Sequence, residues 1–252
     1  MSSTTIALVT GASRGLGANM AQHLARAGVG VIGTYQRSRE EAEQLVTELQ
    51  QAGVPAAALP LDVSDSSSFG TFVTAVRQTL ADFDTDHLDA LVNNAGTGVH
   101  ASFTETTEAQ FDEMVAVQLK GPYFVTQALL PLIADGGRIL NVSSGLARFT
   151  GPGYAAYAAM KGAIEVLTRY QAAELGARQI RVNTLVPGAI ATDFGGGMVR
   201  DNAQVNQAVA EAIALGRVGL PDDIGAAVPA ILSDAFGWAT GTRIELSGGQ
   251  NL

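Results

Sequence analysis

The feature that most constrains the fold of this chain is its first unit, an apolar strand followed by a glycine-rich turn and a helix. Ile6–Val9 is a short apolar run of the kind that forms a buried parallel strand. Thr10–Gly17 then carries glycines in the pattern G-x-x-x-G-x-G, and the helical stretch Ala18–Ala27 closes at Gly28. Backbone N–H groups and the positive end of a helix dipole meet there, which suits a pyrophosphate. The unit predicts a dinucleotide site, although a simple tight turn would also explain these glycines, which depart from the general G-x-G-x-x-G fingerprint.

The rest of the chain repeats the alternation of apolar strands and amphipathic helices. Such alternation predicts an α/β protein with a doubly wound, seven-stranded parallel sheet and helices on both faces. A chain of 252 residues with 47% hydrophobic residues suits one such domain over residues 1–252. The further strands are expected at Val29–Tyr35, Ala56–Leu61, Leu88–Asn93, Arg138–Val142, Arg181–Val186 and Thr242–Leu246. The further helices are expected at Arg39–Gln51, Ser67–Ala81, Glu108–Ile133, Tyr154–Leu175 and Pro221–Ser233.

Polar or glycine-rich groups follow three of these strands. They are Asn93–Gly96, the pair Ser143 and Ser144, and the pair Pro187 and Gly188. In an open α/β sheet, ligands gather beyond the carboxyl ends of the strands. We therefore expect these groups to line one site.

Tyr157 and Lys161 lie four residues apart in a stretch that should be helical. Positions i and i+4 share a helix face, so both side chains reach the same cleft. A neighbouring cation favours the phenolate and lowers the pKa of a tyrosine, which makes the phenol a useful proton donor and acceptor near neutral pH. Taken alone, the pair is more often a solvated surface pair, and its weight comes from the groups around it.

Together these groups resemble the short-chain dehydrogenase/reductase family in its single-domain Rossmann form, from Thr5 to Leu252. The resemblance includes Arg217–Pro221, Thr240 with Gly241, and Ser247–Gly249. It implies that Tyr157 is the general acid in carbonyl reduction and that Lys161 lowers its pKa and holds the nicotinamide ribose. Ser144, thirteen residues before Tyr157, matches the catalytic serine better than Ser143 does. Tyr154 has Ala158 four residues on, so we interpret it as a wall of the substrate cleft.

The same resemblance assigns a set of positions to the cofactor. Asp62 and Val63 match the adenine contact, and the positions after the Arg181–Val186 strand match the contact with the nicotinamide carboxamide. The full set is Gly11, Ser13, Arg14, Gly15, Leu16, Gly17, Tyr35, Arg37, Ser38, Asp62, Val63, Asn93, Ala95, Gly96, Tyr157, Lys161, Pro187, Gly188, Ile190 and Thr192.

The second strand indicates NADP rather than NAD. NAD-binding folds place an acidic residue at the end of this strand, where it bonds the ribose hydroxyls. Here Gly33–Ser38 contains no carboxylate, while Arg37 and Arg14 would neutralise a 2′-phosphate through the planar guanidinium fork. The alternative is that both arginines are ordinary surface charges.

Gln118 departs from the family pattern, which usually has asparagine at this place in the helix after the fourth strand. That asparagine is thought to bond the helix backbone and to hold a water that links the catalytic lysine to solvent. Glutamine has the same amide one methylene further out. It either replaces the asparagine in this catalytic relay or weakens the relay.

Charge and composition exclude several other roles. A net charge of −9 argues against nucleic acid or an anionic membrane as partner. The absence of cysteine excludes disulfides and thiolate metal sites, and His23, His87 and His100 lack metal-ligand spacing, so no metal is expected. Met1–Thr4 open without a basic region or a long apolar run, so neither a signal peptide nor a membrane span is expected and the protein should be cytoplasmic.

These observations favour an NADPH-dependent oxidoreductase that reduces a ketone or aldehyde to an alcohol. The alternatives are a 3-oxoacyl carrier-protein reductase and, in another class, a non-catalytic NADP-binding sensor or structural subunit. An acidic carrier protein needs basic residues at the cleft, where Arg178 would serve but Asp135 would not, so a small free carbonyl substrate is preferred. Residues 192–215 read as a mobile lid. A homo-oligomer, a tetramer by resemblance, is expected to use the two long helices and the C-terminal segment.

Overall fold

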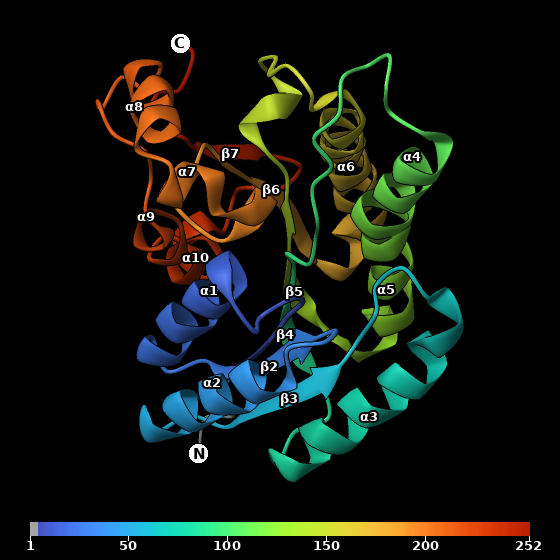
Figure 1. The fold of residues 1–252 in the computed structure, drawn as a ribbon. Coiled ribbons are helices and arrows are strands. Elements are labelled where there is room, and N and C mark those ends of the chain that lie inside the picture. Colours follow the sequence, from blue (N-terminus) through green and yellow to red (C-terminus); the bar gives the residue numbers. More distant parts are fainter. Residues whose placement is uncertain (1–4) are drawn as a thin grey trace.

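Seven parallel strands form a single sheet in the order β3-β2-β1-β4-β5-β6-β7 in the computed structural model, which describes residues 5–252 (Figure 1). Met1–Thr4, which entered the expectation about a signal peptide, lie outside the described residues. The predicted parallel sheet is confirmed. Its strands are β1 Ile6–Val9, β2 Gly30–Tyr35, β3 Ala56–Pro60, β4 Leu88–Asn93, β5 Ile133–Val142, β6 Arg181–Pro187 and β7 Arg243–Leu246.

Helices cover both faces of the sheet, as the doubly wound prediction requires. The α-helices are α1 Gly15–Arg26, α2 Arg39–Gln51, α3 Phe69–Asp82, α4 Glu108–Val115, α5 Gly121–Leu129, α6 Ala155–Leu175, α7 Met198–Asp201, α8 Ala203–Glu211, α9 Pro221–Gly225 and α10 Val228–Ile231. One buried cluster joins the sheet to α1, α2, α9 and α10. A second cluster joins the opposite face to α3, α5 and α6. Each face buries a continuous apolar layer, which is the main source of stability in such a fold.

The predicted helix Glu108–Ile133 is wrong as a single element. It consists of α4, a π-helical stretch Ala116–Lys120, α5 and a 3₁₀ turn Leu130–Leu132. Pro131 lies in that turn, where its missing N–H prevents a regular helix from continuing. Ile133 already belongs to β5, which starts five residues earlier than predicted.

The start of β5 is irregular, which explains why the pattern of its first residues was not recognised. Ile133 pairs with Leu88 and Arg138 pairs with Ala90, so several β5 residues face one residue of β4. Gly136 has φ +78°, in the left-handed region that glycine tolerates. A bulge of this kind breaks the alternation on which strand prediction depends.

The predicted helix Pro221–Ser233 is likewise divided, into α9 and α10. Gly225 packs against the side chain of Asn19 on α1. Pro229 follows within α10 and has no N–H to donate back to the preceding turn. The apolar pattern predicts one helix, but the helix is interrupted between α9 and α10, and both pieces pack against α1.

Two expected absences can be compared with the part of the chain that the structure describes. Over residues 5–252, no helix combines the length and the apolar character needed to cross a membrane. The same residues contain no cluster of histidine and acidic side chains suited to a metal ion. His23 and His87 contact neighbouring aspartates, and His100 packs edge-on against Tyr154.

Candidate active site

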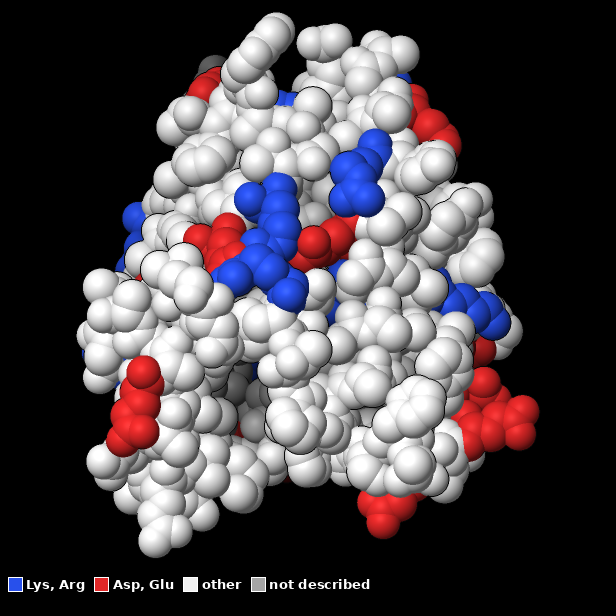
Figure 2. Space-filling view, turned by 90° about the horizontal axis from the view of Figure 1, so that it is seen from above, with Lys and Arg blue, Asp and Glu red and all other residues white. Residues whose placement is uncertain are grey.

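The positions predicted to form the site lie beyond the carboxyl ends of the parallel strands. The loops after β4, β5 and β6 all extend to the upper side of the molecule in Figure 1, where α7 and α8 of the segment 192–215 also lie. The chain builds the sheet outward from β1 to β3 on one side and from β4 to β7 on the other. The switch point between β1 and β4 is where open α/β sheets bind ligands. Seen from above, this side is mostly uncharged, with several charged side chains gathered near the centre beside a hollow (Figure 2).

The glycine-rich turn forms a close-packed cradle. Gly11 has φ +65°, and a Cβ on it would lie 2.9 Å from the Cα of Ala95, so only glycine fits. Asn94 donates its side-chain amide to the carbonyls of Thr10 (2.9 Å) and Gly11 (3.2 Å). The Thr10 hydroxyl accepts from the backbone N–H groups of Asn94 and Ala95. The loops after β1 and β4 are therefore locked together.

The N-terminus of α1 leaves its first N–H groups free for an anion. Arg14 is the N-cap and makes no side-chain capping bond, and the first turn holds no acidic residue. Free N–H groups and the helix dipole bind phosphate at such a position. The cradle and this helix end fit the diphosphate of a dinucleotide.

The end of β2 carries the residues predicted to meet the adenosine. Tyr35 is half-buried and Arg37 is exposed. Asp62, after β3, accepts from Ser64 N–H (2.9 Å) and Gln36 Nε2 (2.7 Å). Hydrogen bonds from Ser64 are the main cause that lowers the pKa of Asp62, with a smaller contribution from nearby Arg37.

The side chain of Asn93, a predicted cofactor position, belongs to an internal network. It is buried and donates to Thr126 Oγ1 (2.9 Å) on α5 and to Asn141 Oδ1 (2.8 Å) on β5. A contact of Asn93 with the cofactor would therefore use its backbone, and the contact stays a prediction. The neighbouring Asn94, which sequence reasoning passed over, supports the cofactor cradle instead.

The proposed catalytic side chains come from the end of β5 and the first turns of α6. Tyr157 and Lys161 are buried, and Lys161 Nζ lies 5.5 Å from the centre of the Tyr157 ring. Lys161 Nζ donates to the carbonyl of Val142 at 2.8 Å. Ser143 turns towards α6 and donates to Glu165 Oε1 (3.0 Å), whereas Ser144 Oγ accepts from the N–H of Leu146 (3.3 Å) and acts to lower the pKa of Tyr157. Ser144 rather than Ser143 stays the predicted catalytic serine.

Burial, rather than the lysine, dominates the protonation of this pair. Desolvation raises the pKa of Tyr157 well above its ordinary value, and the hydrogen bond with Ser144 offsets only part of that rise. Desolvation also lowers the pKa of Lys161 to about 7. Lys161 is not among the causes that shift the pKa of Tyr157, so the expectation that it lowers this pKa stays a prediction. At neutral pH Tyr157 is a protonated phenol.

Gln118 sits in the π-helical stretch, a geometry that is often found at functional sites. Its Nε2 donates to the carbonyl of Thr97 in the loop after β4, not to its own helix. Its Oε1 is buried and has no partner among the described residues. The side chain also closes the space beside Gly96, where a Cβ would lie 2.7 Å from Nε2.

An aromatic wall that sequence reasoning only partly anticipated surrounds Tyr157. Tyr154 packs edge-on against it at 6.5 Å between ring centres, and Phe194 from the lid packs at 5.7 Å. His100 lies 4.9 Å from Tyr154. Phe194 was missed because nothing in the local sequence places the lid over the tyrosine.

Arg178 does not lie where a carrier protein would dock. It pairs with Asp135 (2.7 Å) and donates to the carbonyls of Leu130 and Ile133. These contacts lie at the amino end of β5, opposite the site. The predicted role of Arg178 at the cleft mouth is wrong.

A dinucleotide cradle at the switch point, with serine, tyrosine and lysine beside it, defines an oxidoreductase of the Rossmann type. A family model described as enoyl-(acyl carrier protein) reductase matches residues 11–251. A short-chain dehydrogenase/reductase of Pestalotiopsis microspora is 36% identical, covering 97% of this chain and 94% of its own. Versicolorin reductase 1 of Aspergillus parasiticus is 34% identical, covering 97% and 95%.

Solved structures lead to the same family. The angucycline C-6 ketoreductase LanV with bound NADP has a TM-score of 0.93 and 33% identity, covering 99% of this chain and 96% of its own. The chain belongs to the short-chain dehydrogenase/reductase family.

Proposed function

We propose that the protein is an NADPH-dependent reductase that converts a ketone or aldehyde to an alcohol, reversibly, with Tyr157 as the general acid. The observation that carries the proposal is the convergence of Tyr157, Lys161 and Ser144, with the phenol kept protonated by burial. A protonated phenol is the form needed to donate a proton to a carbonyl oxygen.

The chain's own residues have distinct tasks in this scheme. Bound NADPH supplies the hydride. Ser144 Oγ hydrogen-bonds the substrate oxygen on which charge develops, and Tyr157 Oη gives it a proton. Lys161 holds the nicotinamide ribose, and its pKa of about 7 lets it exchange protons with solvent near neutral pH. Gln118 orders the loop after β4 through Thr97.

NADP is the cofactor that the basic residues favour. Arg37 is exposed just after β2, and the segment Gly33–Ser38 contains no carboxylate. The structure of LanV with bound NADP supports the same choice. Gly11, Ser13, Gly15, Leu16 and Gly17 would hold the diphosphate and adenosine side. Pro187, Gly188, Ile190 and Thr192, which follow β6, would hold the nicotinamide.

The substrate is proposed to be a free ketone with an aromatic or otherwise flat apolar body. Tyr154, Phe194 and His100 provide ring faces and edges beside Tyr157. Aromatic rings favour offset or edge-on partners. The relatives versicolorin reductase 1 and the angucycline C-6 ketoreductase LanV are reductases by name, which supports the reduction of a ketone. A carrier-bound substrate is less favoured because Arg178 is engaged elsewhere.

Residues 192–215 are proposed to be the lid over this cleft. Gly195, Gly196 and Gly197 have φ of 61°, 75° and 75°, a run of left-handed backbone that only glycine adopts readily. Such a run provides a hinge between β6 and α7. Phe194, at its start, would leave the Tyr157 ring when the lid opens.

The proposal is tested with a panel of aromatic ketones, aliphatic ketones, aldehydes and oxoacyl thioesters, each assayed with NADPH and NADH. Tyr157→Phe should lower kcat by about 10²–10⁴-fold on every active substrate. Tyr170→Phe, on the exposed face of the same helix, is the matched control and should retain activity. NADPH consumption that survives in Tyr157→Phe would overturn the role of Tyr157 as general acid. A wild type inactive on the whole panel would favour the alternative of a non-catalytic NADP-binding protein.

A further inference from the structure

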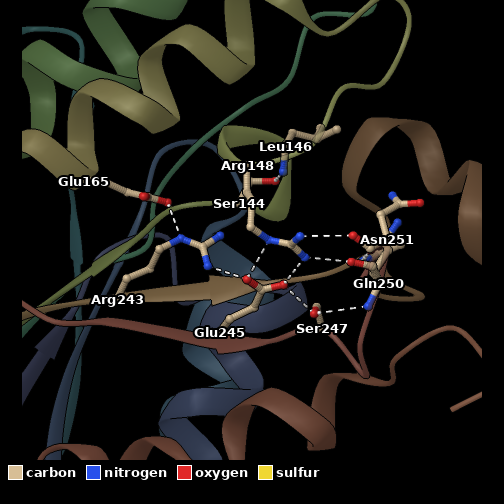
Figure 3. Close-up of polar contacts among 10 residues, drawn as sticks. Ser144, Leu146, Arg148, Glu165, Arg243, Glu245, Ser247, Gln250 and Asn251 are labelled. Atoms are coloured by element: carbon tan, nitrogen blue, oxygen red, sulfur yellow. Dashed lines mark hydrogen bonds and ion pairs between the residues drawn. The ribbon is translucent and has the colours of Figure 1, made fainter. Parts of the chain in front are cut away.

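Arg148 joins the loop of Ser144 to the C-terminal segment. It lies four residues after Ser144, at the end of the 3₁₀ turn that Ser144 begins. Its guanidinium donates to Glu245 (2.9 and 3.2 Å) and to the carbonyls of Gln250 (2.8 Å) and Asn251 (3.0 Å), as Figure 3 shows. One side chain thus makes four hydrogen bonds across about a hundred residues of sequence.

Glu245 on the edge strand β7 connects this arginine to the helix of Tyr157 and Lys161. It accepts from Arg148, from Arg243 and from Ser247 Oγ (2.6 Å). Arg243 Nε in turn lies 3.0 Å from Glu165 Oε1, one helical turn after Lys161 (Figure 3). The Ser144 loop and the helix of Tyr157 and Lys161 are therefore connected through the carboxylates of Glu245 and Glu165.

Gln250 links the same network to two further parts of the site. Its Oε1 accepts from the N–H of Ala189 at 2.9 Å, beside the predicted nicotinamide positions Pro187 and Gly188. Residues 212–215, which end the lid, pair with residues 248–251 through bonds such as Leu215 N–H to Gly248 O (3.1 Å). The segment 247–251 touches the serine loop, the nicotinamide loop and the lid.

We propose that Arg148, Glu245 and Gln250 are positioning residues, which hold the Ser144 loop, the Tyr157–Lys161 helix, the nicotinamide loop and the end of the lid in one register. None of the three is assigned a contact with substrate. The inference rests on the proposed function, since it concerns the placement of Ser144 against Tyr157. A displacement of about 1 Å between reacting groups can cost about 10²-fold in rate.

The arrangement is suited to precise placement because most of its charges are shielded. The Glu245 side chain is 21% exposed and the Arg148 side chain 38% exposed. Hydrogen bonds between charged groups that are partly desolvated are stronger and shorter than those of surface pairs. The guanidinium of Arg148 donates to several acceptors at once, and the single ammonium of a lysine cannot bond all of them in the same geometry.

The test compares Arg148→Met and Arg148→Lys with the control Arg138→Met. Arg138 lies six residues before Ser144 on β5 and pairs with Asp234 (2.7 Å), away from the network. Hydrogen–deuterium exchange of the ligand-free protein is measured over residues 144–149 and 212–215. In parallel, kcat, the KM for NADPH and the isotope effect with NADPH deuterated at the transferred position are measured on the best ketone of the panel.

For Arg148→Met we expect faster exchange in both segments, a fall in kcat of about 10-fold, a larger isotope effect and an unchanged KM for NADPH. Arg148→Lys should lie between this variant and the wild type. Arg138→Met should change neither the exchange of these segments nor the isotope effect. A smaller folded fraction alone would lower the rate without moving the isotope effect.

The proposal is overturned if Arg148→Met matches Arg138→Met in kcat and isotope effect, whether or not its exchange is faster. Equal exchange in the two variants would also overturn it. A wild type without turnover on any carbonyl would overturn the proposed function instead, and the exchange data would still test the coupling of the loops. The two failures are therefore distinguishable.

Discussion

Arg14 Nε lies 3.0 Å from Asp193 Oδ2, so the glycine-rich turn is paired with the start of the segment 192–215, the proposed lid. The Arg14 side chain is 71% exposed and that of Asp193 35% exposed. An ion pair with that exposure contributes only about 0–1 kcal/mol. A bound phosphate therefore competes readily with Asp193 for this arginine, and cofactor binding and lid contact become linked.

Cofactor choice follows from Arg37 and Arg14. Arg37→Ala should weaken NADPH binding by about 10-fold or more, the worth of a hydrogen bond to a charged group, and leave NADH binding unchanged. Asp193→Asn should tighten NADPH binding slightly, because it releases Arg14. Fluorescence titration with both cofactors measures this. Equal losses for NADPH and NADH, or a wild type that prefers NADH, would refute the NADP assignment.

Gln118→Asn is expected to change kcat by no more than a few-fold. The glutamine amide already reaches the carbonyl of Thr97, and a side-chain rotamer change absorbs one methylene. Steady-state kinetics at saturating NADPH measures the effect. A tenfold or greater rise in kcat at constant KM would mean that the native glutamine impairs proton delivery to Tyr157.

Lys161 makes stability depend on pH above neutrality. Its folded-state pKa of about 7 lies below the value of 10.5 that it has when exposed, so between these pH values the unfolded chain binds more protons. The free energy of unfolding should therefore rise with pH from about 7 towards 10. Below pH 7 Lys161 is charged in both states, and the fold carries the full penalty for burying that charge. Urea unfolding of wild type and Lys161→Met at pH 7 and 9.5 checks this. The methionine variant should lose this increase, and should be more stable at pH 7 by about 1 kcal/mol or more. A methionine variant that keeps the wild-type increase would contradict the assignment to Lys161.

Glu245 should make stability depend on pH in the acidic range. Burial alone raises its pKa, but hydrogen bonds from Arg148, Arg243 and Ser247 outweigh burial and bring the pKa to about 2. A lowered carboxylate pKa stabilises the fold above the unfolded value of 4.5 and loses that contribution as pH falls towards 2. Thermal unfolding should show a loss on the order of 2 kcal/mol over this range in wild type and a smaller one in Glu245→Gln. Parallel curves for the two proteins would disprove it.

A homotetramer remains a prediction, and the exposed apolar residues of α4, α5 and α6 support an oligomer. Phe111, Tyr123, Phe124, Val166 and Tyr170 are between 38% and 64% exposed. Large apolar side chains exposed on these helices would be covered in an oligomer, and exposed apolar surface of this kind is typical of interaction sites. Light scattering should give about four times the chain mass of 26.0 kDa, and Tyr170→Glu should lower it. A monomer at micromolar concentration would contradict the prediction.

The strands and the catalytic group were predictable because they are local patterns. Leu88–Asn93 was placed with its observed bounds, and Tyr157 and Lys161 lie on the predicted face of α6. Periodicity and spacing carry that information directly. The breaks at Pro131 and Pro229 were missed because the apolar pattern continues through them, although proline itself gave the signal.

The protonation of the site residues could not be predicted from the sequence, because it depends on how the chain folds around them. Burial decides the protonation of Tyr157 and Lys161, and burial depends on elements distant in sequence such as the Phe194 lid segment. Arg148 and Glu245 are 97 residues apart, so no local signal connects them. The orientation of Asn93 depended on which layer of the sheet its side chain faces, which the motif does not specify.

The π-helical stretch Ala116–Lys120 has a consequence for the direction of the side chains within it. Each residue of an α-helix advances by about 100° around the axis. In a π-helical turn each residue advances by less than this, so five residues turn about as far as four residues of a regular α-helix. Deleting one residue from this stretch would therefore let it wind as a regular α-helix while α4 and α5 keep nearly the same relative orientation. Met114, fully buried beside Tyr157 and Met160, would stay in contact with them. The side chains within the stretch would change direction instead, so its extra residue determines where Gln118 points.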